Sequence, residues 1–524
     1  MEQYNAAVWL LDRQLDQGHG DRTAYRVDGA TISYADLQSE VWRAQNALRG
    51  LDVRRGERVA LIVDDEAALP AWFLGCLRSG VVPVPLSTML TAEELASIVA
   101  DAGAGVVVVS ARYGGLLPAL ATAAADLRHS VVLSGDSPGP GADDQLDLPV
   151  HRWPDIAEPS EAPVASTGPD SPAFWLYSSG TTGQPKGVMH RHASLQATAE
   201  SYARAVLEIG PDDRCLSVAK LFFAYGLGNS LTFPLSVGAS AVLNPRRPTP
   251  PDVLDLVRAE QPTLFFATPG FIAALVDTDP ADDAFASVRC TVSAGEALPA
   301  DLQRRFQGRF GHPVLDGIGT TEALHIFLSN TKGDEQPGTS GRPVPGYDAR
   351  LVDEAGHEVT EPDAPAYLEV RGPSLATGYW CRDAATRAAF RGEWLTTGDV
   401  YRRSADGYWT FLGRNNDMIK AGGIWVSPAE VESVLVEHPD VLEAAVVGGR
   451  DRHGLEATVA FLVPRAGHEI DAEAIDAHCR ERMAAFKRPR RIEVTDELPK
   501  TPTGKIRRFA LRERLAAEAP PAPP

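Results

Sequence analysis

The sequence predicts an α/β protein built from a large N-terminal domain and a small α+β C-terminal domain. The chain has 524 residues, of which 44% are hydrophobic, so it is longer than one ordinary domain and can bury substantial cores. Short apolar runs alternate with helix-like segments along most of the chain, as they do in α/β layers. A second series of such segments begins after Gly413 and spans about 110 residues, enough for a separate small domain.

Residues 1–413 form the expected large domain. A helix is expected at Thr91–Ala102, TAEELASIVADA. The expected strands include Arg58–Val63, Gly105–Val109 and Thr263–Ala267. Their apolar runs lack polar alternation, which predicts burial on both faces. Ser134–Asp147 is rich in Gly, Pro and Asp, so we expect a surface connection between two subdomains there.

Residues 414–524 form the expected small domain. Helices are expected at Pro428–His438 and Asp471–Met483. The expected strands are Leu442–Val447, Ala457–Val463 and Arg491–Val494. The chain ends in a Pro/Ala-rich tail, which we expect to be disordered from about residue 517.

The composition restricts the class of partner. A net charge of −20 and a pI near 5.1 repel phosphate backbones and anionic lipids, so we expect neither nucleic acid nor membrane as a partner. No apolar run reaches the ~20 residues that span a bilayer, and the N-terminus lacks the pattern of a secretory signal, so we expect a cytoplasmic protein. The five cysteines form no CxxC pair, and we expect them to be reduced and buried in the core.

Tyr177–Gly187, YSSGTTGQPKG, is the strongest local signal. It lies between an expected strand, AFWLY, and an expected helix. Glycines allow the backbone to approach a ligand closely, and hydroxyls, backbone N–H groups and a lysine all donate toward an anion, so the loop is a candidate phosphate cradle. A Walker A loop needs a second glycine where Pro185 stands, which excludes a P-loop NTPase. The cradle residues are Ser178, Ser179, Gly180, Thr181, Thr182, Gly183 and Lys186.

This loop and five later motifs resemble those of the acyl-adenylate-forming superfamily, which includes acyl-CoA synthetases, peptide-synthetase adenylation domains and luciferases. The later motifs are SAGEALP (Ser293–Pro299), DGIGTTE (Asp316–Glu322), TTGD (Thr396–Asp399), GRNNDMIK (Gly413–Lys420) and PKTPTGKIR (Pro499–Arg507). The resemblance implies that ATP, Mg²⁺ and coenzyme A take part in a reaction of two steps. An acyl-adenylate forms first, and its acyl group then passes to a thiol.

The same resemblance implies the catalytic residues Lys505, Glu322, Thr321 and Lys186. Glu322 and Thr182 would hold Mg²⁺, which prefers hard oxygen ligands. Lys505 would bridge the acid substrate and the α-phosphate. Because the first step joins two anions, donors and cations must converge on the reacting atoms.

The implied nucleotide site extends beyond the cradle. Asp399 would accept hydrogen bonds from the ribose hydroxyls, a role that suits a carboxylate with two acceptor oxygens. Arg414 would contact the ribose or the phosphates. The tyrosine that usually stacks on adenine in this superfamily is Ile318 here. The further nucleotide-binding positions are Gly295, Glu296, Ala297, Asp316 and Gly317.

Two segments, KLFFAYGLGNSLTFPL (Lys220–Leu235) and LHIFLSN (Leu324–Asn330), resemble the benzoate-CoA ligase branch. They imply a small aromatic carboxylic acid as substrate, benzoate or a lightly substituted benzoate. No acidic residue is evident among them, which disfavours an amino acid because its ammonium would be buried unpaired. The hydroxyl of Tyr225 and the imidazole of His325 could bind a ring substituent. The implied acid site comprises Phe223, Ala224, Tyr225, Gly226, Gly319, His325 and Ile326.

The thiol acceptor is implied by residues of the small domain. Phe486 and Arg488 match positions that contact coenzyme A in related ligases, and Lys420, Gly422 and Gly423 match a loop that lines the pantetheine channel. The resemblance makes the C-terminal domain mobile about a hinge at Asn416, where Asp or Lys is usual.

Two alternatives stay open. An acyl carrier protein could replace free coenzyme A as the acceptor, and a protein of another class, a catalytically silent acyl-nucleotide binder, could share the motifs. A silent binder is expected to lose Lys505 or Glu322, and both residues are present. The expected assembly is a monomer or a homodimer.

Overall fold

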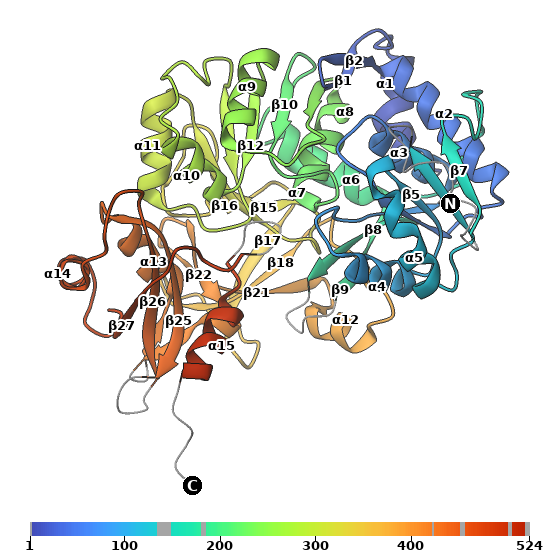
Figure 1. Ribbon diagram of the computed structural model, residues 1–524. Coiled ribbons are helices and arrows are strands. Elements are labelled where there is room, and N and C mark those ends of the chain that lie inside the picture. The colour runs from blue at the N-terminus through green and yellow to red at the C-terminus, as the bar shows by residue number, and fades with distance from the viewer. Residues whose placement is uncertain are drawn as a thin grey trace.

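The computed structural model describes residues 3–133, 148–179, 185–421, 424–450, 456–500 and 506–518. A large N-terminal part, drawn blue to yellow in Figure 1, stands beside a small C-terminal domain drawn orange to red. The predicted α/β class and the division into a large and a small part are confirmed. The connection expected at Ser134–Asp147 lies outside the described residues.

The first subdomain is built on a five-stranded parallel sheet in the order β4-β3-β5-β6-β7. Along β3, Val59 and Leu61 pack in one hydrophobic cluster with helix α3, while Ala60 and Ile62 pack in another with helix α4. The predicted burial on both faces is therefore confirmed. Helix α4 begins after Thr91, whose side chain and Glu94 form a capping box. The strands are β3 Arg58–Ile62, β4 Val82–Pro85, β5 Ala104–Val109, β6 His129–Leu133 and β7 Val150–Trp153; the helices are α3 Ala68–Ser79, α4 Ala92–Ala102 and α5 Leu117–Ala123.

The second subdomain is built on a nine-stranded sheet in the order β16-β15-β14-β13-β12-β10-β11-β1-β2. Its centre, β10 to β14, is parallel, so the carboxyl ends of these strands meet at one edge. Helices α9, α10 and α11 cover one face (Figure 1). The strands are β1 Thr23–Val27, β2 Ala30–Ser33, β10 Arg214–Ser217, β11 Ser240–Leu243, β12 Leu264–Ala267, β13 Cys290–Ser293, β14 Val314–Gly319, β15 Ile326–Ser329 and β16 Arg342–Pro343; the helices are α1 Arg13–Asp16, α2 Tyr34–Gly50, α7 Ala224–Leu227, α8 Phe233–Val237, α9 Pro250–Glu260, α10 Pro269–Asp277 and α11 Ala300–Phe310.

The candidate phosphate cradle connects two antiparallel strands, β8 (Pro172–Ser179) and β9 (Pro185–Arg191). The helix expected after the loop is present and begins at His192 as α6, but a strand that the sequence did not predict, β9, lies between the loop and this helix. The helix N-terminus is therefore separated from the loop by a whole strand. Strand β19 (Gly378–Tyr379) pairs with the far side of β9.

A further five-stranded sheet leads from the large domain to the small one. It contains β17 Asp348–Val352, β18 Ala366–Arg371, β20 Phe390–Arg391, β21 Trp394–Arg403 and β22 Trp409–Arg414, with helix α12 Asp383–Ala389 beside it. The register of β21 on β22 places Asp399 opposite Arg414, where the chain leaves the large domain.

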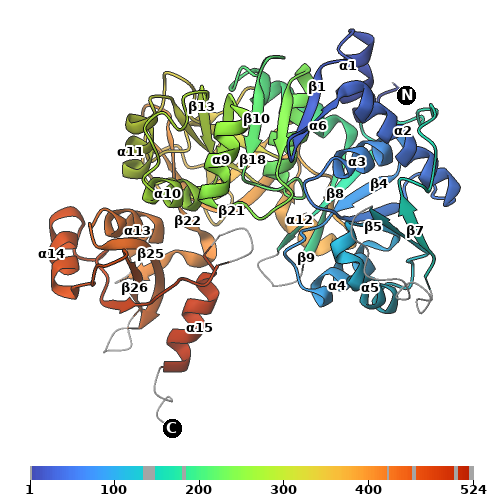
Figure 2. The same ribbon diagram turned by 45° about the horizontal axis from the view of Figure 1, so that its top comes forward.

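The C-terminal domain has the predicted α+β order. Strands β25 and β26 separate two hydrophobic clusters, one under α13 and α14 and the other under α15. Figure 2 shows this domain beside α10 and α11. Helix α15 was not predicted, and it contains residues 517 and 518, where a disordered tail was expected. The elements are β23 Ile419–Ala421, β24 Ile424–Val426, α13 Pro428–Val436, β25 Val441–Arg450, β26 Glu456–Pro464, α14 Ala472–Arg482, β27 Arg491–Val494 and α15 Arg508–Glu518.

The structure shows where the cysteines lie and whether any described helix could span a membrane. Four cysteines are buried, but Cys381 is exposed, so the expectation that all five lie in the core is wrong for this residue. No helix within the described ranges is long and apolar enough to cross a membrane.

Candidate active site

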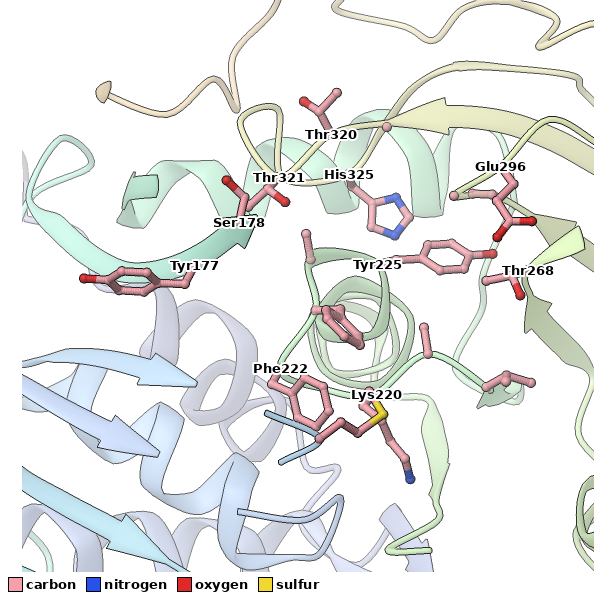
Figure 3. A pocket seen from close by; sticks show the side chains of 18 of the residues that line it. Tyr177, Ser178, Lys220, Phe222, Tyr225, Thr268, Glu296, Thr320, Thr321 and His325 are labelled. Atoms are coloured by element: carbon pink, nitrogen blue, oxygen red, sulfur yellow. The ribbon is translucent and has the colours of Figure 1, made fainter. Parts of the chain in front are cut away.

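A cavity of about 1140 Å³ lies at the carboxyl ends of the central parallel strands. This edge of an open α/β sheet is where ligands commonly bind, because the loops that follow the strands converge there. The β8–β9 hairpin, the loops after β10, β12, β13 and β14, and the C-terminal domain all contribute lining residues. Figure 3 shows the region, with Ser178 and Thr321 on one side and Tyr225 and His325 near the centre.

One end of the cavity gathers polar residues of the glycine-rich motifs. Ser178, Lys186, Thr321 and Glu322 all line it, as predicted. The Tyr379 hydroxyl donates a hydrogen bond of 2.9 Å to Oε1 of Glu322, and the Lys186 Nζ atom lies 5.2 Å from the centroid of the Tyr379 ring. Tyr379 therefore joins the cation to the carboxylate, a role that the sequence analysis missed. The structure does not describe the tip of the β8–β9 loop, which contains Gly180, Thr181, Thr182 and Gly183, nor the side chain of Ser179.

The predicted nucleotide residues divide into two groups. Gly295, Glu296 and Arg414 line the cavity, and Gly295 has φ = 99°, a conformation that favours glycine. Asp399 is 1% exposed, and one of its oxygens lies 2.8 Å from Nε of Arg414. Among the described residues, the lining does not include Ala297, Asp316, Gly317, Ile318 or Asp399.

Asp316 lies behind the cavity wall. The register of β13 on β14 places it beside Ser293, and burial raises the pKa of Asp316 well above its usual range. Its carboxyl group is therefore more readily protonated than a solvent-exposed one.

The predicted acid site forms the aromatic part of the cavity. Phe223, Ala224, Tyr225, Gly319, His325 and Ile326 all line it. The Tyr225 and His325 rings have centroids 5.5 Å apart (Figure 3). Gly226 is not among the described lining residues; a Cβ atom there would lie 2.0 Å from the Lys220 carbonyl oxygen, so glycine permits a close backbone approach beneath the wall.

The polar tips of the acid site already have partners. The Tyr225 hydroxyl donates to the Val292 carbonyl over 3.0 Å, and Nε2 of His325 lies 3.2 Å from Oδ1 of Asn229. Burial lowers the pKa of His325 to about 3, so the imidazole is neutral at physiological pH. The proton of the Tyr225 hydroxyl is therefore used inside the wall, which leaves the hydroxyl oxygen as an acceptor for a ring substituent; binding of a substituent by Tyr225 or His325 stays a prediction.

The cavity also contains a buried carboxylate and a buried amine that the sequence analysis missed. Asp65 is 4% exposed, and its Oδ1 accepts a hydrogen bond of 3.1 Å from the backbone N–H of Leu221. Nζ of Lys220 donates to the Arg246 carbonyl over 2.7 Å. Burial raises the pKa of Asp65 to about 6 and lowers that of Lys220. The two aromatic segments contain no acidic residue, but Asp65, from another part of the chain, holds the turn that carries this wall.

The C-terminal domain contributes Glu443 and Lys500 to the cavity, and their side chains lie 2.5 Å apart. Lys500 pairs with Ile506 across a backbone bridge. Lys505 lies between Lys500 and Ile506 in the sequence but is not among the described residues. Gly422 and Gly423 also lie outside the described residues. The structure describes the backbone but not the side chains of Asn416 and Lys420.

The predicted coenzyme A residues lie away from the cavity in this arrangement. Phe486 packs against the core under α13 and α14, and Nε of Arg488 donates to the Met483 carbonyl over 3.2 Å. Neither residue is among the described residues that line the cavity. No cluster of three or more His, Cys, Asp or Glu that could hold a metal ion occurs in the described part of the chain.

Known proteins share this sequence and this arrangement. A benzoate–CoA ligase of Thauera aromatica is 45% identical over 98% of this chain and 96% of its own length. A 4-hydroxybenzoate–CoA/benzoate–CoA ligase of Rhodopseudomonas palustris is 41% identical over 100% of this chain and 97% of its own length. The crystal structure of an anthranilate CoA ligase in complex with anthranoyl-AMP matches with a TM-score of 0.93 and 38% identity, covering 99% of this chain and 98% of that one.

The family assignment follows from matches along the whole length of the chain. The sequence pattern of the AMP-binding enzyme family matches residues 11–380, and that of the AMP-binding enzyme C-terminal domain matches residues 430–505. The resemblance inferred from the motifs is confirmed: the chain belongs to the AMP-binding enzyme family.

Proposed function

We propose that the protein is an ATP-dependent aryl acid–CoA ligase that acts on benzoate or a lightly substituted benzoate. The observation that carries this proposal is a single cavity in which an aromatic wall, Phe223 to Tyr225, meets the polar end formed by Lys186, Thr321 and Glu322. An aryl carboxylate held by the wall would face a nucleotide held by the polar end. The benzoate–CoA ligases at 41–45% identity support this choice of acid.

In the first step, a carboxylate oxygen of the acid attacks the α-phosphorus of ATP, and pyrophosphate leaves. The barrier is lowered when donors converge on the charge that develops at phosphorus. Lys186, Thr321 and Ser178 surround the proposed phosphate position. Lys505 is proposed to supply a further positive charge there, since a compact ammonium on a flexible stem suits a contact that is made and broken.

The residues present fit a magnesium ion. Mg²⁺ usually keeps several waters and binds through one or two carboxylates together with substrate phosphates, so one carboxylate at the cavity is enough. Glu322 lines the cavity and is proposed to hold the ion together with Thr182. The bound ion would neutralise part of the phosphate charge.

The ribose is proposed to bind at Asp399 and Arg414. These side chains face each other across β21 and β22, and their ion pair holds the carboxylate at the border of the cavity. A ribose hydroxyl can donate to a carboxylate oxygen while the guanidinium fixes its orientation. Gly295, Glu296, Ala297, Asp316, Gly317 and Ile318 are proposed to surround the adenine.

In the second step, the thiol sulfur attacks the acyl carbon and AMP leaves. Lys420, Gly422 and Gly423 are proposed to border the thiol path, and Phe486 and Arg488 to contact coenzyme A. Because Phe486 and Arg488 lie off the cavity in the described arrangement, this step requires the C-terminal domain to move about the segment near Asn416.

Pyrophosphate exchange across a panel of acids tests the proposal. Benzoate, hydroxybenzoates, anthranilate, phenylalanine, hexanoate and acetate are compared at saturating ATP. The acid that gives the highest kcat/KM is then offered with coenzyme A or with a phosphopantetheinylated carrier protein. Preference for an aryl acid and for coenzyme A supports the proposal. Preference for the carrier protein would identify a carrier-loading enzyme, and ATP binding without exchange would identify a silent binder.

A further inference from the structure

An ion pair joins helix α10, which lines the cavity in the large domain, to the small domain. Arg465 follows β26, and its Nη1 atom lies 3.0 Å from Oδ1 of Asp277, the last residue of α10. The side chains are 26% and 33% exposed, so the pair is partly shielded from solvent. Figure 2 shows α10 beside the C-terminal domain, in agreement with this contact.

Asp277 stands on a helix that lines the cavity, and Arg465 follows a strand that pairs with another lining element. Helix α10 contributes Gly270, Phe271 and Ala274 to the lining and ends at Asp277. Arg465 is fixed in the small domain, because its backbone N–H donates to the Asp440 carbonyl over 2.9 Å. Strand β25, antiparallel to β26, contributes Glu443. The ion pair therefore ties a helix that lines the cavity to the domain that contributes Glu443 and Lys500.

Asp277 is poorly placed for the stability of its own helix. A negative charge in the last turn of a helix lies near the negative end of the helix dipole and is unfavourable there. The structure describes one side-chain partner for Asp277, and that partner belongs to the other domain. The position is therefore better explained by contact between the domains than by helix capping.

The chain connection alone does not fix the orientation of the small domain. The domains are joined by β22 and residues 415–417, and a second ion pair, Arg402 to Glu430 at 3.4 Å, lies close to this connection. The Asp277–Arg465 pair adds an attachment on a different helix. Two separated attachments restrict rotation, whereas contacts at one connection leave it free.

We propose that Asp277 and Arg465 are positioning residues that hold the C-terminal domain over the cavity for adenylate formation. The inference rests on the proposed function, because it assigns the described arrangement to the first step. Lys500 and Glu443 reach the cavity in this arrangement, and Lys505 follows Lys500 by five residues. Loss of the pair reduces the population of the arrangement but removes no group that touches substrate.

The test separates the two half-reactions. Asp277→Asn and Arg465→Gln should each slow pyrophosphate exchange by about two- to fivefold, the range for a partly exposed ion pair. Thioester formation from supplied acyl-adenylate should not slow. Asp279→Asn is the matched control, because Asp279 pairs with Arg309 over 2.8 Å within the large domain, two residues from Asp277. This control should leave exchange unchanged.

A charge reversal distinguishes positioning from general damage. The double variant Asp277→Arg with Arg465→Asp should recover exchange relative to either reversed single variant. High salt should slow exchange by the wild type more than by Asp277→Asn, because salt screens the pair. Equal slowing of both half-reactions would overturn the inference. So would rates of pyrophosphate exchange in Asp277→Asn and Arg465→Gln that match the rate of the Asp279→Asn control. The assay uses whichever acid the wild type activates, so failure on aryl acids counts against the proposed function and not against the ion pair.

Discussion

Asp65 is the buried carboxylate that the cavity wall depends on most directly. Its folded pKa of about 6 exceeds the unfolded value near 4, so between these pH values the native state binds more protons than the unfolded state. The free energy of unfolding of the wild type therefore falls as the pH rises from about 4 to about 6. Above about pH 6, Asp65 is ionised in both states and this loss is complete. Asp65→Asn keeps an acceptor for the Leu221 N–H without the charge.

We compare the free energy of unfolding of Asp65→Asn with that of the wild type. The difference should shift in favour of the variant by up to about 3 kcal/mol between pH 4 and pH 7, because only the wild type loses stability over this range. Thermal unfolding at both pH values measures the change. Asp213→Asn is the opposite control: although burial acts to raise the pKa of Asp213, hydrogen bonds from Arg289 and Thr263 lower it overall. Because the folded pKa of Asp213 lies below its unfolded value, that variant should lose stability relative to wild type as the pH rises toward about 4, so its unfolding is measured below this pH as well. The same sign for both variants, each in its own pH window, would refute this account of Asp65.

Gly228 shapes the acid site from behind. A Cβ atom at this position would lie 2.3 Å from Cδ2 of His325 and 2.6 Å from its Nε2 atom. Gly228→Ala should therefore push the imidazole off Asn229 and into the aryl cavity. We expect KM for the aryl acid to rise about tenfold, the scale of one misplaced group in an apolar pocket, with little change in KM for ATP.

Steady-state kinetics with each substrate varied in turn measures this split. Gly308→Ala is the matched control, because a Cβ atom there would meet nothing within 4 Å. Equal KM values for the aryl acid in both variants would show that His325 does not border the acid.

At this scale, the sequence predicted the residues that belong to contiguous motifs and missed those that reach the site from elsewhere. Ser178, Lys186, Thr321 and Glu322 were identified because each stands in a recognisable run. Asp65 and Tyr379 come from segments that precede or follow these runs by many residues. The signal available for Asp65 was a run of three acidic residues, Asp64 to Glu66, directly after an apolar strand, and such a run is also typical of a solvated turn.

At the scale of elements, the strands and helices named from the sequence lie within a few residues of the observed ones, and β9 and α15 are two of the elements that were not predicted. Strand β9, PKGVMHR, contains Pro, Gly and Lys, which weaken a strand pattern; it forms because β8 and β19 pair with its two edges. Helix α15 follows a Pro/Gly-rich motif and has a narrow apolar face, so its helical pattern was not recognised. Both elements are stabilised by contacts with distant parts of the chain, which a local sequence pattern does not reveal.

Leu511 is the side chain that anchors α15. It is 2% exposed and packs in the cluster that covers β25 and β26. Leu511→Ala should destabilise the C-terminal domain by about 2–4 kcal/mol, since it removes a buried side chain and leaves a cavity. Phe509→Ala on the same helix is the matched control, because Phe509 is 47% exposed and should change stability by less than about 0.5 kcal/mol. Thermal unfolding of the two variants, followed by hydrogen exchange in β25 and β26, checks the expectation. Equal destabilisation would show that α15 does not rely on Leu511.

At the scale of the whole molecule, the fold places two binding surfaces at one sheet edge and closes them with a second domain. The resemblance carried by the six motifs implied this organisation. Only SAGEALP and DGIGTTE stand at the carboxyl ends of parallel strands, β13 and β14, and the other motifs belong to the β8–β9 hairpin, to β21 and β22, and to the C-terminal domain. The relative orientation of the domains was not predictable, because it depends on contacts such as Asp277 to Arg465 between residues that lie 188 positions apart.

The central claim is that an aryl acid is joined to coenzyme A through an acyl-adenylate. Wild-type protein is incubated with benzoate, ATP, Mg²⁺ and coenzyme A, and products are quantified by mass spectrometry beside parallel reactions with hexanoate, acetate and phenylalanine. We predict benzoyl-CoA and AMP in equal amounts, with benzoyl-adenylate accumulating when coenzyme A is withheld. A clear preference for any non-aromatic acid or for phenylalanine, or release of ADP in place of AMP, would contradict the account.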